Sequence, residues 1–286
     1  MSGQLLRRGR DSGEGWPVTA RALPAAVLAV SIAAASTAFA GAPYHHDIDN
    51  RRCCLFIAHA GGGIDGNPYT NSEEAVLANL KMGVRVFEVD FSPTRDGVWV
   101  GTHDWQTWRK QTGYGESQPP TYADFVRNRL NVTGPTVIGG RYSAITIPFL
   151  EGLLARYPRM VIITDTKYDL MQMARALKDT KLFKRIVPQA YSFEDVQALA
   201  ALGYRKVILT LYKMEVRDPM QLTSRLASMT GKLHALTAPM RFFAEHHKLL
   251  TGIGIPVYVH GAPTHINSMS LHNNFRRQGV AGFYLD

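Results

Sequence analysis

The chain has 286 residues, of which 45% are hydrophobic and 19% charged, and this composition is typical of an ordinary globular protein with enough apolar material for a core. Its 32 Lys and Arg against 23 Asp and Glu give a formal net charge of +9, which favours anionic substrates or peripheral contact with an anionic membrane. The sequence has no basic helix, zinc-ligand spacing or aromatic RNA-binding motif, so we expect no nucleic-acid partner. Because the basic residues are scattered, a surface that is merely soluble and basic is the alternative.

The first 40 residues predict a secretory signal peptide. Residues 22–40 read ALPAAVLAVSIAAASTAFA, follow several arginines and end in an Ala-Phe-Ala that suits signal peptidase. The run is too short and too rich in alanine to favour a permanent membrane span, although a retained anchor is the alternative. We therefore expect cleavage after Ala40 and a secreted or periplasmic protein. Without the four arginines and two acidic residues of this segment, the net charge is +7.

The segment after the predicted cleavage point contains the two cysteines. The polar lead GAPYHHDIDNRR (residues 41–52) contains His and Asp, but we interpret it as a solvated N-terminal segment rather than a metal site. Cys53 and Cys54 are adjacent, and adjacent cysteines rarely bridge each other because the geometry is strained. We expect both to be buried at the start of the first strand, with an intermolecular bridge as the alternative.

From residue 55 onward, short apolar runs alternate with segments of helical periodicity. Eight runs predict strands, at Leu55–His59, Val84–Asp90, Met160–Asp165, Arg185–Gln189, Lys206–Leu211, Leu233–Leu236, Pro256–His260 and Gly282–Leu285. Between them the periodicity predicts helices at Ser72–Met82, Phe149–Tyr157, Leu170–Asp179, Phe193–Leu202, Pro219–Met229, Arg241–Leu250 and roughly Ile266–Gln278. This alternation predicts one α/β domain over residues 41–286, a TIM (β/α)8 barrel. An open, doubly wound sheet is the alternative.

Two segments depart from the regular alternation. Val98–Gly101 follows Asp90 too closely for a helical crossover, so we interpret it as a hairpin return at the rim of the barrel. The long insert Asp104–Ile147 has Gly- and Pro-rich ends and a predicted short helix near Tyr122–Leu130. We interpret this insert as a loop over the mouth of the barrel.

Ionisable side chains stand at the ends of several predicted strands. Glu88 and Asp90 are two residues apart on one strand, so both side chains face the same way. Two carboxylates held that close repel each other, and a hard divalent cation is the common remedy. Asp165 ends the run VIITD and is a natural third oxygen ligand. We therefore expect one divalent metal ion, Ca²⁺ or Mg²⁺, on these three residues.

Two histidines and a lysine complete the predicted site. His59 and His103 end strand-like runs on either side of the carboxylates, and two histidines that flank a metal-bound anion can serve as general acid and base. Lys167 lies two residues beyond the last strand carboxylate and suits a phosphate oxygen. A lone histidine is more often structural. The joint occurrence of the carboxylates, the two histidines and the lysine at predicted strand ends is what indicates a catalytic site.

This set of motifs closely resembles the glycerophosphodiester phosphodiesterase family, which shares its barrel and metal site with phosphatidylinositol-specific phospholipases C and sphingomyelinase D-type enzymes. The similar motifs are His59, Asn71-Ser72-Glu73-Glu74-Ala75, Gly83 through Glu88-Val89-Asp90, Thr94-Arg95-Asp96-Gly97 and His103-Asp104. The resemblance continues in IPFLEGLL, ITDTK, QAYSF and GVAGFYLD, and spans roughly residues 55–286.

The resemblance implies a metal-dependent hydrolase that cleaves glycerophosphodiesters to glycerol 3-phosphate and an alcohol. His59 and His103 would be the acid/base pair, and a neighbouring substrate hydroxyl would attack first and give a cyclic phosphate. One alternative is a phospholipase C- or D-like enzyme or lyase that acts on intact phospholipid. Another is a secreted barrel that binds a phosphate ligand without turnover. The substrate is expected to be a small-molecule or lipid phosphodiester in each case.

The sequence departs from the family pattern in two places. The family usually has an Arg directly after the first His, where it binds phosphate, but this chain has Ala60 followed by three glycines. The backbone N–H groups of Gly61 and Gly62 are candidates for an anion nest. Other candidate replacements are Lys167, Arg141 and Arg109. The family's third metal ligand is typically Glu, whereas here it is Asp165, and this shorter side chain resembles the sphingomyelinase D-type relatives.

Aromatic residues are frequent near the predicted mouth. They are Trp99, Trp105, Trp108 and Tyr114. These rings could face a choline group or an acyl chain, with Trp105 as the candidate substrate contact. Packing of the insert is the alternative interpretation. His260 ends the seventh predicted strand and is a further candidate for the mouth. The histidines interpreted as structural or surface residues are His234, His246, His247, His265 and His272.

Overall fold

The computed structural model describes residues 55–134, 137–212, 214, 218–260 and 269–285. The predicted signal, the polar lead and both cysteines lie outside these residues. The side chains of residues 55, 132–134, 137–141, 219 and 269–272 are not described either. Within the described part of the chain, no helix is both long and apolar enough to cross a membrane.

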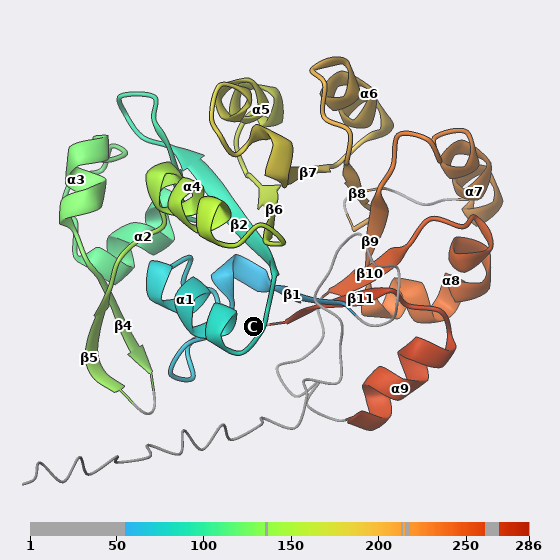
Figure 1. Ribbon diagram of the computed structural model, residues 1–286, viewed down its shortest axis with the longest axis horizontal. Helices are drawn as coiled ribbons and strands as arrows, with labels where there is room; N and C mark the ends of the chain where they lie inside the picture. Colours follow the sequence, from blue (N-terminus) through green and yellow to red (C-terminus); the bar gives the residue numbers. More distant parts are fainter. Residues whose placement is uncertain (1–54, 135–136, 213, 215–217, 261–268, 286) are drawn as a thin grey trace, which may run out of the picture. The chain divides into compact units, whose positions relative to one another are not determined.

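Eight parallel strands close into a barrel (Figure 1). They are β1 (Leu55–Ala58), β2 (Val86–Pro93), β6 (Val161–Asp165), β7 (Ile186–Ala190), β8 (Ile208–Thr210), β9 (Ala235–Pro239), β10 (Val257–His260) and β11 (Gly282–Leu285). Strand order around the barrel follows chain order, and β1 pairs with both β11 and β2. Because the sheet has no open edge among these strands, the predicted TIM barrel is confirmed and the open sheet is wrong.

The predicted helices lie on the outside of the strands (Figure 1). They are α1 (Glu73–Lys81), α4 (Ile147–Arg156), α5 (Leu170–Lys178), α6 (Phe193–Ala201), α7 (Pro219–Ala227), α8 (Met240–Gly252) and α9 (Met269–Arg277). The start predicted for the last helix, residues 266–268, lies outside the described residues. Two short 3₁₀ turns, η1 (His59–Gly61) and η2 (Phe183–Arg185), were not predicted.

The barrel interior is filled by one buried side chain from each of the eight strands. This layer consists of Ile57, Val86, Ile163, Val187, Ile208, Ala235, Tyr258 and Tyr284. Since side chains alternate between the two faces of a strand, the residues two places further on also point inward. Those positions carry His59, Glu88 and Asp165, among others. The apolar layer therefore lies directly beneath the polar residues at the carboxyl end of the barrel.

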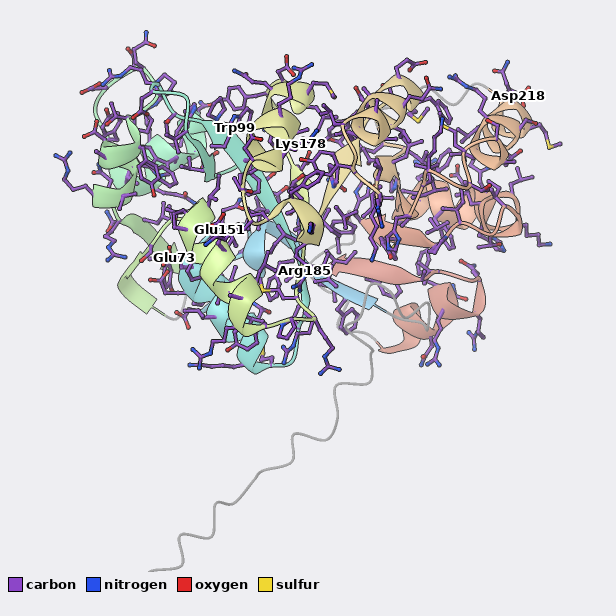
Figure 2. All side chains as sticks on the ribbon, turned by 45° about the horizontal axis from the view of Figure 1, so that its top comes forward. Glu73, Trp99, Glu151, Lys178, Arg185 and Asp218 are labelled. Atoms are coloured by element: carbon purple, nitrogen blue, oxygen red, sulfur yellow. The ribbon has the colours of Figure 1, made fainter. Side chains whose placement is uncertain are left out.

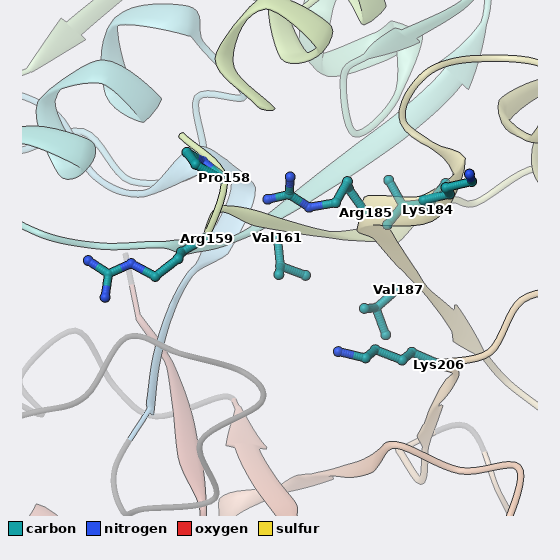
Figure 3. A pocket seen from close by; sticks show the side chains of 8 residues that line it. Pro158, Arg159, Val161, Lys184, Arg185, Val187 and Lys206 are labelled. Carbon is teal, nitrogen blue, oxygen red and sulfur yellow. The ribbon is translucent and has the colours of Figure 1, made fainter. Parts of the chain in front are cut away.

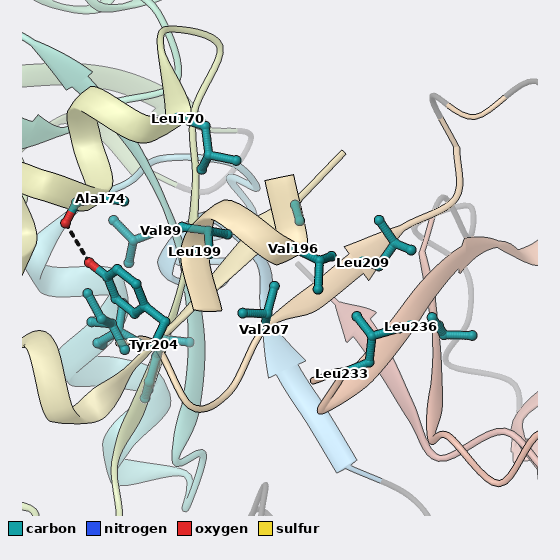
Figure 4. Close-up of a cluster of buried hydrophobic side chains, with 14 of the residues drawn as sticks. Val89, Leu170, Ala174, Val196, Leu199, Tyr204, Val207, Leu209, Leu233 and Leu236 are labelled. Carbon is teal, nitrogen blue, oxygen red and sulfur yellow. Dashed lines mark hydrogen bonds between the residues drawn. The ribbon is translucent and has the colours of Figure 1, made fainter. Parts of the chain in front are cut away.

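A second core fills the space between the strands and the helices (Figure 4). Leu170 and Leu199, from α5 and α6, are buried there with Val89 and Val207. The hydroxyl of Tyr204 donates a hydrogen bond of 2.7 Å to the carbonyl of Ala174 within this core. Burial of a side chain of Leu or Val size stabilises the fold by about 1.5–3 kcal/mol, so this layer fixes the strand ends in place.

The segment between β2 and α4 is a folded insert. Its first part, β3 (Trp99–Gly101), pairs antiparallel with β2 as the predicted hairpin return. It continues as α2 (Trp105–Thr112), α3 (Tyr122–Arg127), β4 (Leu130–Gly134) and β5 (Val137–Tyr142). The short helix at Tyr122 was predicted. Helix α2 and the β4–β5 hairpin were not, so the segment interpreted as a loop contains regular elements with a core of their own.

The insert is attached to the barrel beside α1. The hydroxyl of Tyr142 donates a hydrogen bond of 2.5 Å to Asp65 Oδ2, in the loop after β1. The backbone N–H of Ser143 donates to Glu74 Oε2 of α1 at 2.8 Å. These contacts anchor the insert to α1 and to the loop that follows His59, which is part of the predicted site.

Candidate active site

The three predicted metal ligands meet at the carboxyl ends of two paired strands. Glu88 and Asp90 stand on β2, and Asp165 ends β6 directly opposite Asp90. One oxygen from each of the three carboxylates lies within 4.8 Å of the others. Glu88 and Asp90 are only 1% and 4% exposed. Carboxylates buried so closely repel, and three hard oxygen donors fit a divalent ion such as Ca²⁺ or Mg²⁺.

The loop after β1 holds the two β2 carboxylates. The backbone N–H of Ala60 donates to Glu88 Oε2 at 2.8 Å. The amide of Asn71 donates to Asp90 Oδ2 at 2.9 Å, and its oxygen accepts from the Asp90 backbone N–H at 3.2 Å. Both Ala60 and Asn71 have left-handed backbone angles, with φ of 48° and 46°. That conformation costs about 1–2 kcal/mol per residue, so the loop is strained in order to position the carboxylates.

Asn71 is a site residue that sequence reasoning missed. Ser72, the next residue, caps α1 by accepting a hydrogen bond of 3.2 Å from the Ala75 N–H. Asn71 instead faces the carboxylates and is itself tied to the loop, because its N–H donates to the Ala60 carbonyl at 2.9 Å. Its place in the family-like Asn-Ser-x-x-Ala motif was the available signal.

Asp165 is positioned by the residue that follows β7 and by its own loop. The Tyr191 hydroxyl donates to Asp165 Oδ1, which also accepts from the Thr166 N–H at 2.6 Å. Burial and the neighbouring Asp165 carboxylate hold the pKa of Tyr191 well above its ordinary value, so the hydroxyl stays protonated and remains a donor. Tyr191 was also missed. It belongs to the QAYSF motif, which carried no role by itself.

Both predicted histidines lie at this site. His59 Nε2 is 3.9 Å from Glu88 Oε2, and the side chains of His59 and His103 are each 26% exposed. The ring of Tyr69 contacts both edge-to-face, with centroids 4.3 Å from His59 and 5.3 Å from His103. Tyr69, which the sequence did not single out, therefore lies between the two histidines.

Asp104 orients His103. Its carboxylate lies 2.7 Å from His103 Nδ1 and accepts a hydrogen bond from the Thr107 N–H as the cap of α2. Burial alone would raise the pKa of Asp104, but these hydrogen bonds outweigh it and lower the pKa to about 2. An ionised carboxylate only accepts hydrogen bonds, so His103 Nδ1 must be the donor. In neutral His103 the lone pair is then on Nε2, which is free to act as a base.

The predicted phosphate-binding cations have different surroundings. Lys167 Nζ is 3.6 Å from Asp104 Oδ2 and its side chain is 53% exposed, so it lies at the rim of the same site. Arg109 donates to the carbonyl of Ser117 at 2.8 Å, within the insert. Arg141 belongs to β5, but its side chain lies outside the described part of the chain.

The glycines after His59 have a structural reason to be there. Gly62 has φ of 90°, and a side-chain carbon at this position would approach Asn79 Nδ2 to 2.4 Å. The N–H of Gly62 donates to the His59 carbonyl at 2.7 Å, and that of Ala60 is bound to Glu88. These two N–H groups therefore already donate hydrogen bonds to other groups of the protein. Substrate binding by Gly61 and Gly62 stays a prediction.

The three tryptophans among the described residues pack inside the protein. Trp105 is buried in the core of the insert with Trp108 and Phe125, and its indole N–H donates to the Pro93 carbonyl at 3.1 Å. Trp99 is buried in the main core. This placement favours the packing interpretation of the aromatic residues over contact between Trp105 and a substrate.

Other rings line the mouth at the strand ends. His260 has ring contacts with Tyr212 at 5.4 Å and Tyr284 at 6.4 Å. Burial and the nearby His59 lower the pKa of His260 to about 4, so it is neutral at physiological pH. The Tyr284 hydroxyl donates to Gln189 Oε1 at 3.0 Å across the barrel. These residues, which lie away from the carboxylates, therefore give their side of the mouth an aromatic and uncharged lining.

The protein is a closed (β/α)8 barrel with three carboxylates and two histidines at the carboxyl ends of its strands. Enzymes with this fold place their active sites at that end of the barrel. No protein-family model and no curated protein matches the chain. Solved structures of glycerophosphodiester phosphodiesterases do match it in fold.

A glycerophosphoryl diester phosphodiesterase from Parabacteroides distasonis is similar with a TM-score of 0.65 and 17% identity, over 85% of this chain and 89% of that one. A glycerophosphodiester phosphodiesterase from Agrobacterium tumefaciens is similar with a TM-score of 0.58 and 17% identity, over 82% and 96%. The enzyme from Thermotoga maritima has a TM-score of 0.53 and 14% identity, over 82% and 95%. The chain therefore shares the fold of these proteins over nearly their whole length.

Proposed function

We propose that the protein is a metal-dependent glycerophosphodiester phosphodiesterase, which releases glycerol 3-phosphate and an alcohol. The observation that carries this proposal is the convergence of Glu88, Asp90 and Asp165 with His59 and His103 at one end of the barrel. The fold shared with glycerophosphodiester phosphodiesterases supports it.

In this proposal Glu88, Asp90 and Asp165 hold one Ca²⁺ or Mg²⁺. When bound, a divalent ion would polarise a phosphoryl oxygen and offset the negative charge that develops on it. Ala60, Asn71 and Tyr191 contribute by fixing the carboxylates, because each donates a hydrogen bond to one of them. Ligands held in this way lose little conformational freedom when an ion binds.

The two histidines divide the proton transfers. His103 Nε2 takes the proton of the attacking hydroxyl, and Asp104 stabilises the resulting imidazolium through Nδ1. His59 is then the acid that gives a proton to the departing alcohol oxygen as the P–O bond breaks, and water afterwards opens the cyclic phosphate to glycerol 3-phosphate. Lys167 Nζ lies 3.6 Å from Asp104 Oδ2, at the rim of the same site. Its ammonium group contributes a positive charge that binds the phosphate.

The test is turnover of a panel of glycerophosphodiesters, phosphatidylinositol and sphingomyelin with Ca²⁺ or Mg²⁺. We expect glycerophosphodiesters to release alcohol, and EDTA to abolish the activity. His103→Ala should lower kcat by about 10²–10⁴-fold, the usual contribution of a general acid or base. His246→Ala, on the outer helix α8, is the matched control and should leave kcat unchanged.

Other outcomes would point to a different function. Full activity of His103→Ala, or indifference to EDTA, would contradict the proposed mechanism. Activity only on lipid dispersions with a cyclic phosphate product would identify a lyase of the phospholipase type. Tight binding of glycerophosphodiesters with no turnover would identify a binding protein. Each of these results is read from the same product assay combined with a binding titration.

We also propose that residues 1–40 direct secretion and are removed after Ala40. Support comes from the apolar run and the Ala-Phe-Ala ending alone. N-terminal sequencing of the protein expressed in a secreting host should find Gly41 as the first residue. Recovery of the full-length chain from the cytoplasm would count against this proposal.

A further inference from the structure

A basic pocket lies at the amino-terminal ends of the strands, opposite the proposed active site (Figure 3). Four basic residues line it, namely Arg159, Lys184, Arg185 and Lys206. Its floor includes Val187, which belongs to the apolar layer inside the barrel, and Val161, which packs against that layer. Figure 3 shows Arg185 and Lys206 on either side of these two valines. The pocket therefore lies at the starts of β6, β7 and β8, with an aliphatic floor and a basic rim.

The spacing of three basic residues follows the strand register. Arg159, Arg185 and Lys206 each come two residues before an inward-facing aliphatic residue, on β6, β7 and β8 respectively. These three strands are neighbours in the barrel. All three side chains line the same pocket, although Arg159 lies in a turn and Arg185 in the 3₁₀ turn η2, just before their strands. No acidic side chain is among the residues that line the pocket.

Arg185 is held in place by the backbone. One terminal nitrogen of its guanidinium donates to the carbonyls of Tyr157, at 3.3 Å, and Met160. A guanidinium has five N–H donors, and the other three make no hydrogen bond to another described residue. Arg159 and Lys184 are exposed and form no ion pair with any described residue. The rim thus combines a guanidinium held by backbone carbonyls with two exposed cationic side chains.

The size of the pocket selects a small ligand. Its volume is about 210 Å³, below the roughly 300–1,000 Å³ of pockets for drug-sized ligands. Guanidinium and ammonium groups around a small cavity match the oxygens of a phosphate group. We propose that this pocket binds a phosphate-type dianion, either a small phosphate ester or the head group of an anionic lipid. Binding there leaves the mouth of the barrel accessible, since the mouth is at the other end of the strands.

The experiment compares two double variants that remove the same charge. Arg159→Gln with Lys206→Gln alters the pocket, whereas Arg175→Gln with Lys178→Gln alters exposed residues of α5, where Figure 2 labels Lys178. Inorganic phosphate and glycerol 3-phosphate are titrated into each protein by calorimetry, with EDTA present. We expect the pocket variant to raise the Kd at least fivefold and the α5 variant to change it less than twofold.

A second arm distinguishes the source of the phosphate. Sedimentation with phosphatidylcholine vesicles, with and without phosphatidic acid, measures binding to a lipid head group. If the ligand is a lipid, the pocket variant should lose sedimentation with the anionic vesicles and the α5 variant should keep it. If it is a soluble ester, only the calorimetric arm should respond to the pocket variant.

Equal behaviour of the two double variants in both arms would overturn the proposal. Thermal unfolding without phosphate checks that each variant is folded. If the double variant is not, the single substitution Arg159→Gln decides the question, because this side chain is exposed and its loss is tolerated by the fold. Neither arm measures turnover, so the result is independent of the proposed enzymatic activity.

Discussion

Glu88→Gln should stabilise the protein in the absence of divalent ions. The Glu88 carboxylate has an oxygen within 4.8 Å of both other carboxylates. At that separation and an effective dielectric constant of about 20, two unit charges repel by about 3.5 kcal/mol. Glutamine has the same shape and keeps an oxygen that can accept the 2.8 Å hydrogen bond from Ala60. The substitution therefore removes charge and leaves the geometry in place.

The measurable gain is smaller than the bare repulsion, because local relaxation and the hydrogen bonds donated to the carboxylates already offset part of it in the natural protein. We expect a gain of about 1–3 kcal/mol in the free energy of unfolding, and a rise of roughly 2–4 °C in Tm per kcal/mol. With divalent ion at 100 times its Kd, the natural protein should gain about 2.7 kcal/mol by mass action. The variant, which lacks one ligand charge, should gain little.

The assay is urea and thermal unfolding in EDTA and in Mg²⁺ or Ca²⁺. Glu245→Gln is the control, because it removes one negative charge from exposed helix α8. We expect the control to keep the stabilisation by divalent ion and to show no gain in EDTA. The electrostatic reasoning would be refuted if Glu88→Gln were less stable than the natural protein in EDTA, or if it kept the full response to divalent ion.

Two further predictions concern residues that support the site. Asp104→Asn should destabilise the protein by about 2 kcal/mol near neutral pH, since the pKa of Asp104 is lowered to about 2 from 3.8. A carboxyl group whose pKa is lower in the folded protein than in the unfolded chain stabilises the fold at pH values above the unfolded pKa. This stabilisation is lost as the pH falls toward the folded pKa. The difference in urea midpoint between variant and natural protein should therefore shrink between pH 6 and pH 3; a constant difference would contradict this origin. Asn71→Ala removes two buried hydrogen bonds to Asp90 at a left-handed residue, and should cost about 3 kcal/mol. It should also raise the divalent concentration needed for half-maximal activity, and an unchanged requirement would show that Asn71 does not position Asp90.

The barrel was predictable because its signals are local. Strand runs of alternating or continuous apolar residues, and helices with 3.6-residue periodicity, need only neighbouring positions to be recognised. Helix α2 was missed because Trp105–Thr112 is mostly polar, with two buried tryptophans as its apolar content. The β4–β5 hairpin was missed because its strand Val137–Tyr142 contains two glycines. Both elements form through packing in the insert, which sequence periodicity does not register.

The sequence by itself determined the chemical types at the strand ends. Glu88 and Asp90 had to share a face because they are two residues apart, and Asp165 and the two histidines ended neighbouring runs. These relations follow from the period of the strand. They were enough to predict a cluster of carboxylates between histidines, which the structure brings together.

Only the tertiary structure decided how these groups are held. Asn71 contacts Asp90 across 19 residues and Tyr191 contacts Asp165 across 26, and Tyr69 lies between the histidines through a left-handed backbone angle of 64°. Such contacts depend on loop conformation and on which strands become neighbours, neither of which is a property of local sequence. The same closure of the barrel brought the basic residues before β6, β7 and β8 into one pocket, although they are scattered along the chain.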